Sequence, residues 1–117
     1  MTKEEVSLIG FEIVAYSGEA RSKLLLAIEK AKAKEFEECK KLIDEANESL
    51  NDAHKSQTTL LQQEARGENV EIGFITVHAQ DHLMTTMTLS EMAIEFLEMY
   101  KQFDKLKKAG LVYNEQI

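Results

Sequence analysis

Residue types that interrupt or cross-link a chain are scarce in this sequence. Its 117 residues include no proline and no tryptophan, only five glycines and one cysteine, Cys39. Because proline and glycine are the poorest helix formers, their scarcity beside abundant Ala, Glu, Lys and Leu favours helix over sheet. A single cysteine excludes an internal disulfide, and a free thiol suits a reducing compartment. We interpret Cys39 as a small apolar residue on a helix face.

Long apolar runs and an excess of positive charge are also missing. No stretch approaches the roughly 20 apolar residues that span a membrane. The opening Met-Thr-Lys-Glu-Glu-Val lacks the basic and then apolar order of a signal peptide. A formal net charge of −7 disfavours nucleic acid as a partner. We therefore expect a cytoplasmic protein that neither inserts into a membrane nor binds nucleic acid.

Apolar residues recur at steps of three and four along most of the chain, which is the helical period. They predict three helices, over about 3–31, 35–66 and 70–103, within a single domain, 1–117. The sequence after residue 103 loses the pattern, so the tail 104–117 is expected to fray. Helices of this length joined by short turns predict an all-α fold, an antiparallel three-helix bundle.

The two predicted boundaries differ in how clearly they are marked. Gly67 follows the second apolar row and can adopt the left-handed conformation that commonly ends a helix. The first boundary has no Gly or Pro, and only Lys32-Ala33-Lys34 suggests a turn. We prefer a turn at 32–34, because one uninterrupted helix of about 60 residues would need a coiled-coil partner.

The third predicted helix is apolar on more than one side. Its main row contains Ile75, Ala79, Thr86 and Ala93, whereas further apolar residues lie beside that row. If one row packs inside the bundle, the other stays exposed unless subunits associate. The sequence therefore predicts an oligomer. The additional residues are Leu83, Met84, Met87, Ile94 and Leu97.

Polar groups suited to chemistry concentrate in the same helix. His78, Asp81 and His82 are spaced by three and four residues, so they would project from one face. A lone helical histidine is usually an ordinary surface or hydrogen-bonded residue, whereas two with an acid between them are rarer. Imidazole can hold a proton, a metal or a phosphoryl group near neutral pH. This segment is the candidate site.

Two chemical interpretations of the segment remain open on the residues alone. In the first, His78 and His82 bind a metal, and the chain is a metal-binding helical oligomerisation or adaptor module. That site lacks a third ligand, because the remaining histidine, His54, lies on another helix. In the second, one imidazole accepts and releases a phosphoryl group, with Gln80 and His82 as candidate hydrogen-bond donors. Asp81 would then repel the phosphate unless a cation offsets its charge.

Three separated segments resemble one known family. Val-His-Ala-Gln-Asp-His-Leu-Met-Thr-Thr at 77–86 is similar to the phosphorylation-site segment of the IIA components in the lactose/cellobiose class of the bacterial sugar phosphotransferase system. Gly-Phe-Glu-Ile-Val-Ala-Tyr-Ser-Gly-Glu-Ala-Arg-Ser at 10–22 and Ala-His-Lys-Ser-Gln-Thr at 53–58 are also similar. The resemblance extends from about residue 4 to 103.

This resemblance implies a phosphocarrier with a phosphohistidine intermediate, and hence an enzyme component. His78 would accept the phosphoryl group from the histidine-containing phosphocarrier protein and pass it to a cysteine of the IIB component. The transported sugar would be a β-glucoside or disaccharide of the lactose, cellobiose or chitobiose type. His82 and Gln80 are candidate supporting residues.

The resemblance further implies a homotrimer of three-helix bundles. Asp81 of each subunit would meet its two symmetry mates at the trimer axis and bind a divalent cation, expected to be Mg²⁺. Three carboxylates converging in a buried setting repel one another, and a cation that prefers oxygen ligands would hold them together. No organic cofactor is implied.

Overall fold

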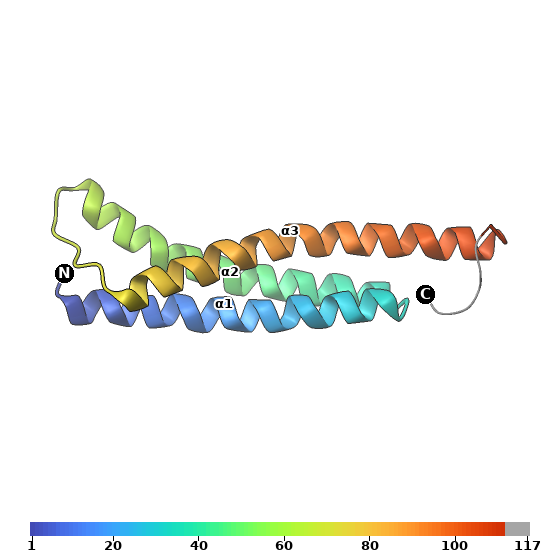
Figure 1. Cartoon of the computed structure of the whole chain (residues 1–117), viewed down its shortest axis with the longest axis horizontal. Helices are drawn as coiled ribbons and strands as arrows, with labels where there is room; N and C mark the ends of the chain where they lie inside the picture. Colours follow the sequence, from blue (N-terminus) through green and yellow to red (C-terminus); the bar gives the residue numbers. More distant parts are fainter. Residues whose placement is uncertain (112–117) are drawn as a thin grey trace.

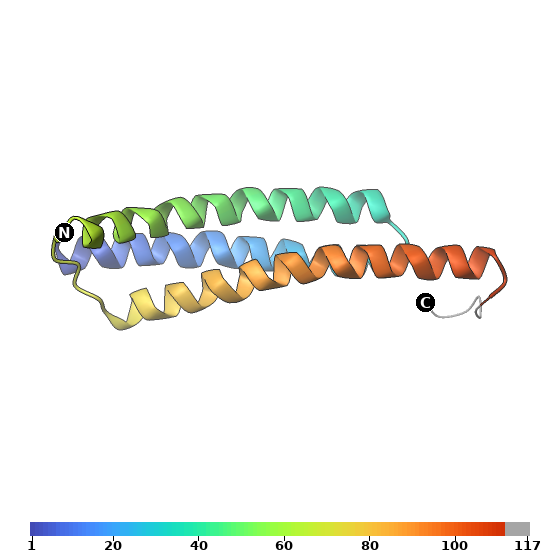
Figure 2. The same cartoon turned by 90° about the horizontal axis from the view of Figure 1, so that it is seen from above.

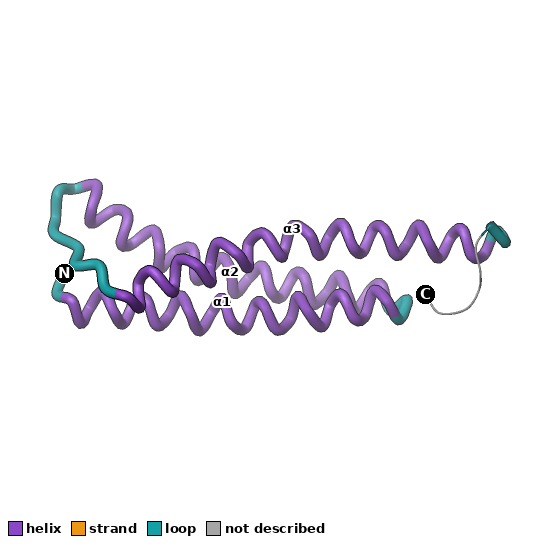
Figure 3. The backbone as a smooth tube through the Cα atoms, viewed as in Figure 1, coloured by secondary structure: helices purple, strands orange, loops and turns teal. Residues whose placement is uncertain are grey.

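Three long helices form the fold of residues 1–111, the part of the chain that the computed structural model describes. They are α1 (Lys3–Lys32), α2 (Phe36–Ala65) and α3 (Phe74–Lys108). Figures 1 and 3 show α1 and α3 running in one direction and α2 in the other, and no strand occurs in residues 1–111. The predicted all-α antiparallel bundle is therefore confirmed.

The three helices are not packed equally. The bundle is 62 Å long, and α1 contacts both other helices extensively, whereas α2 and α3 contact each other less. The two ribbon views show α2 and α3 diverging at the end where the loop joins them (Figures 1 and 2). Grooves lined by residues of α2 and α3 result along this side of the molecule. None of the described helices combines the length and the apolarity that crossing a bilayer requires.

Small and aliphatic side chains fill the interior. Ala20, Ala27, Ala46 and Ala53 are completely buried, which lets the helices approach closely. Cys39 is also buried in this cluster, and its burial raises the pKa of the thiol. The assignment of Cys39 as a small apolar core residue is therefore confirmed. The apolar spacing of the second predicted helix places one row on its inner face: Phe36, Cys39, Ile43, Ala46, Leu50, Ala53, Gln57 and Leu60. The structure confirms this row from Cys39 to Leu60, whereas Phe36 is half-buried.

Each helix ends in the same local motif. The residue after the C-cap adopts a left-handed conformation in all three, with φ of 65° at Lys34, 79° at Gly67 and 73° at Gly110. Around Gly67, the Glu68 N–H donates to the Gln63 carbonyl at 3.1 Å, and Gly67 N–H donates to Glu64 at 3.0 Å. These bonds satisfy carbonyls that would otherwise lack partners. Both predicted boundaries, the turn at 32–34 and Gly67, are confirmed.

Replacing Gly67 with alanine is expected to lower the free energy of unfolding by about 1–2 kcal/mol, because its φ is strained for a residue with a Cβ. Gly18 provides a matched control inside α1, where an added Cβ meets nothing within 4 Å. Gly18→Ala is expected to raise the same free energy by about 0.5–1 kcal/mol. Urea unfolding followed by circular dichroism measures both, and equal effects of the two substitutions would contradict the assignment.

The predicted bounds of the third helix, 70–103, are wrong at both ends. α3 begins at Phe74, because residues 68–73 are not helical and the N-cap Gly73 has an extended backbone. It continues to Lys108, so the prediction that the tail frays from residue 104 fails over 104–108. The apolar pattern stops after residue 103 because the buried residues of the last turns are charged: Asp104 and Lys107 are 8% and 5% exposed. Residues 109–111 follow the helix as a turn, and residues 112–117 of the predicted tail lie outside the described residues.

The inward side of α3 also differs in detail from the prediction. Leu83 and Leu97 belong to the core at 0% and 3% exposure, whereas Met84 and Ile94 are exposed. The predicted second apolar row therefore combined core and surface residues.

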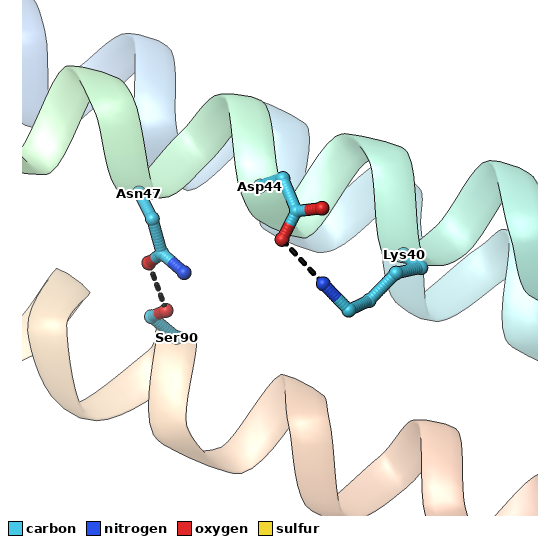
Figure 4. A network of polar contacts seen from close by, with 4 residues as sticks. All are labelled: Lys40, Asp44, Asn47 and Ser90. Atoms are coloured by element: carbon cyan, nitrogen blue, oxygen red, sulfur yellow. Dashed lines mark hydrogen bonds and ion pairs between the residues drawn. The ribbon is translucent and has the colours of Figure 1, made fainter.

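Figure 4 shows one polar contact between helices, in which the Ser90 hydroxyl donates to Asn47 Oδ1 at 2.6 Å, beside the Lys40–Asp44 ion pair within α2.

Candidate functional site

His78 lies in the second turn of α3 with an exposed side chain. The next residue, Ala79, and Leu83 one turn later are completely buried and fix this part of α3 against the core. Ile75, three residues before His78, has its carbonyl oxygen 3.6 Å from where a Cβ of Gly10 would lie. Because residues three apart share a helix flank, His78 projects to solvent on the flank of α3 nearest α1.

A second imidazole contacts the first. The ring centroids of His78 and His82 are 4.5 Å apart, and the ring planes meet edge-on at 73°. His82 is half-buried, one helical turn after His78 on the same flank. The sequence predicted that His78, Asp81 and His82 share a face, and the structure brings the two histidines into contact. The exposed imidazole of His78 is accessible to a reaction partner, and the half-buried imidazole of His82 lies beside it. This arrangement is suited to accepting a chemical group and holding it.

Asp81 points away from the core. Its side chain is exposed, and within residues 1–111 no ion pair joins it to either imidazole. It belongs to a row on the outer face of α3 with alternating steps of three and four residues, the spacing of a coiled-coil seam. We call this row the outer stripe: Phe74, Val77, Asp81, Met84 and Thr88. Phe74 is 88% exposed, and Val77 and Met84 are each more than half exposed.

Gln80 lies on the opposite flank of α3. Its Oε1 accepts a hydrogen bond from Gln57 Nε2 on α2 at 2.9 Å. Two residues along a helix correspond to a rotation of about 200°, so Gln80 does not face His78 of its own subunit. The sequence had placed Gln57 only in the core row of α2. A buried glutamine needs a hydrogen-bond partner, and that requirement was the available signal for this contact.

The third histidine lies on a different helix from the pair. His54 is exposed on α2 and lines the groove between α2 and α3, together with Leu50, Met87 and Glu91. Residues 1–111 contain no group of three His, Cys, Asp or Glu side chains that could hold a metal ion. A metal bound through these residues would therefore need ligands from more than one subunit. The interpretation as a metal-binding module gains no support from the single chain.

Sequence comparison identifies the relatives of this chain. A family model described as the PTS system, lactose/cellobiose-specific IIA subunit, matches residues 8–101. A lactose-specific EIIA component from Staphylococcus epidermidis is 51% identical over 102 residues, covering 87% of this chain and 98% of that protein. One from Streptococcus mutans is 47% identical over the same coverage.

Solved structures share the fold. The crystal structure of PtcA from S. mutans has a TM-score of 0.84 and 48% identity, covering 86% of this chain and 99% of that one. A cellobiose-specific enzyme IIA from Bacillus anthracis also gives 0.84, at 41% identity, covering 90% and 94%. The Escherichia coli IIA(chitobiose), solved in complex with HPr, gives 0.72 at 33% identity, covering 89% and 98%.

These matches define the class of protein. This three-helix chain, matched over most of its length, is a IIA component of the phosphotransferase system. It belongs to the lactose/cellobiose-specific IIA family.

Proposed function

We propose that this chain carries phosphoryl groups on His78. The donor is the histidine-containing phosphocarrier protein, and the acceptor is a cysteine of the IIB component. The cargo of the transport system is a β-glucoside or disaccharide of the lactose, cellobiose or chitobiose type. The single observation that carries the proposal is the exposed imidazole of His78, within the 8–101 match to the IIA family. Exchange with these partners implies a cytoplasmic location.

The chemistry needs little beyond access and alignment. A nitrogen lone pair of His78 attacks phosphorus in the donor phosphohistidine, and the donor P–N bond breaks as its imidazole recovers the electron pair. In the second transfer the thiolate of the IIB cysteine attacks phosphorus, and the His78 P–N bond breaks. Both displacements need a nucleophile and a leaving group in line. An exposed imidazole on a helix with buried neighbours meets that requirement.

His82 is proposed as the residue that supports His78. Its edge-on contact at 4.5 Å restricts the orientation of the His78 ring. A ring nitrogen of His82 can also donate a hydrogen bond to a phosphoryl oxygen, which disperses the charge of the transferred group.

A homotrimer is the proposed assembly. The outer stripe presents apolar side chains at coiled-coil spacing with Asp81 among them. In a parallel trimer about an axis beside α3, the three Asp81 carboxylates would face one another and together offer oxygen ligands suited to a divalent cation such as Mg²⁺. Gln80 would then lie toward a neighbouring subunit, where it is a candidate donor to the phosphoryl group on that subunit's His78.

Asp81→Asn is expected to abolish binding of the divalent cation while trimers persist through the apolar part of the stripe. The amide removes the negative charge but keeps nearly the same shape. Isothermal titration with Mg²⁺ measures the first effect, and sedimentation velocity measures the second. Complete dissociation of Asp81→Asn into monomers would contradict assembly through apolar contacts.

Mass spectrometry of the intact protein tests the proposed function. The chain is incubated with phosphoenolpyruvate and the general phosphotransferase proteins, with an unrelated IIA protein as the positive control for the upstream components. The expected result is one added phosphoryl group per subunit, which is lost when an acceptor IIB protein is added. Absence of the modification while the control is phosphorylated would overturn the proposal.

A further inference from the structure

Positive charge gathers at one end of the bundle. This end comprises the turn between α1 and α2 and the C-terminal turns of α3, residues 29–41 and 98–111. These ranges hold nine of the chain's 14 Lys and Arg residues but only six of its 21 Asp and Glu residues. The rest of the described chain has five basic and fourteen acidic residues. A protein with a net charge of −7 therefore has one end of opposite sign.

The last turns of α3 project beyond the turn that joins α1 and α2, as both ribbon views show (Figures 1 and 2). Lysines are exposed on this projecting segment, and the side chain of Lys108 is 76% exposed. Two apolar residues accompany them, Leu106 at 38% and Leu111 at 70% exposure. We call this surface the basic tip: Lys34, Lys101, Lys105, Leu106, Lys108 and Leu111.

Two carboxylates beside the basic tip, Asp104 and Glu98, neutralise it only in part, because they face three of its four lysines. Asp104 is shared between two lysines, with Oδ2 2.9 Å from Lys108 Nζ and Oδ1 3.7 Å from Lys34 Nζ. The hydrogen bond from Lys108 lowers the pKa of Asp104 and keeps it charged. Glu98 approaches Lys101 at 3.9 Å. Burial and then the nearby Lys34 ammonium lower the pKa of Lys107, a further sign that cations are crowded here.

Compensation of the helix dipole explains only part of this arrangement. Cations in the last turn of a helix are stabilised by the partial negative charge there, and Lys105 and Lys108 meet that condition. Lys101 lies about two turns before the end of α3, beyond the range of the effect. The exposed leucines have no connection with the dipole. Lysines interleaved with exposed leucines are typical of surfaces that bind at a membrane interface.

We propose that the basic tip binds the surface of a bilayer rich in anionic phospholipid headgroups, with the long axis of the bundle directed away from the membrane. Each lysine near such a surface is attracted by about 1 kcal/mol, and the two leucines enter the interfacial region. The acidic remainder of the chain is repelled by the same headgroups, which favours an end-on orientation over a side-on one. This binding is independent of phosphoryl transfer at His78.

Sedimentation with vesicles tests the proposal. The full chain is mixed with vesicles of phosphatidylglycerol and phosphatidylcholine, or of phosphatidylcholine alone, at two salt concentrations. Binding is expected only to the anionic vesicles and is expected to weaken as salt increases. Replacing Lys105 and Lys108 together with glutamine should weaken it about 30-fold, which is the sum of two such attractions.

Lys55→Gln with Arg66→Gln is the matched control, because it removes the same charge from residues outside the tip. This control should bind as the unmodified chain does, and thermal unfolding of both double variants checks that the fold persists. Failure to bind anionic vesicles at low salt, or equal weakening by both double variants, would overturn the proposal. An acidic protein as the true partner of the tip would give the first of these results. Phosphorylation of His78 should be unchanged in the Lys105 and Lys108 variant, so the two proposals fail separately.

Discussion

His78→Ala is expected to reduce phosphoryl incorporation to background, a fall of at least about 10³-fold in transfer rate. Alanine has no nitrogen lone pair, so no covalent intermediate can form, whereas other effects of the change should be small because the side chain is exposed. Mass spectrometry of the intact chain after incubation with phosphoenolpyruvate and the upstream proteins measures the yield. Quenched time courses measure the rate.

The other two histidines are the natural controls for this experiment. His54→Ala should be phosphorylated like the unmodified chain, because His54 lies on α2 and lines a groove that does not include His78. His82→Ala should still accept the phosphoryl group but more slowly, by about 10²-fold, if His82 orients the ring or donates to the phosphoryl oxygens. If His78→Ala were phosphorylated and His54→Ala were not, the acceptor would be His54 and the assignment to His78 would be wrong.

Leu83→Ala is expected to lower the free energy of unfolding by about 2–5 kcal/mol, because it leaves a cavity in a fully packed site. Leu83 is completely buried in the same cluster as Ala79 and Ala93. The expected loss is a large fraction of the 5–15 kcal/mol that stabilises a typical domain. Urea unfolding followed by circular dichroism measures it.

The adjacent residue provides the comparison. Met84 lies on the outer stripe and is 53% exposed, so Met84→Ala should change the unfolding of a single chain by less than about 1 kcal/mol. Its effect is expected instead on association, seen as a larger dissociation constant in sedimentation velocity. A Met84→Ala chain that unfolds as readily as Leu83→Ala and associates normally would contradict the assignment of the outer stripe to an interface.

Local sequence predicted most of the fold. The row of α2 from Cys39 to Leu60 was identified correctly, because an apolar residue at every third or fourth position is sufficient to define a buried helix face. Gly67 was identified because few other residues adopt φ of 79° without strain. The end of α3 was missed because Asp104 and Lys107 occupy its buried positions, and their burial depends on contacts such as Lys34 to Asp104. No apolar pattern reports a contact of that kind.

The candidate site was likewise predicted only in part from the sequence. Spacing alone placed His78 and His82 on one flank, because a helix fixes the angle between residues four apart. Spacing did not show that Gln80 accepts a hydrogen bond from Gln57, since that contact depends on where α2 passes α3. Nor did it show that Asp81 faces outward with Phe74 and Met84, because the choice between two apolar rows depends on the position of the core.

The sequence by itself thus determined the helical class and the two turns that separate the helices, because these follow from local periodicity and from the residues that end a helix. His78 stays a prediction as the phosphoryl acceptor, which rests on the resemblance of residues 77–86 to a known family. Only the tertiary structure decided which side of α3 is inside. That choice depends on the packing of α1 against both other helices, which is a property of distant residues in contact. It leaves His78 exposed on one flank, Gln80 paired on the other and Asp81 on the outer stripe between them.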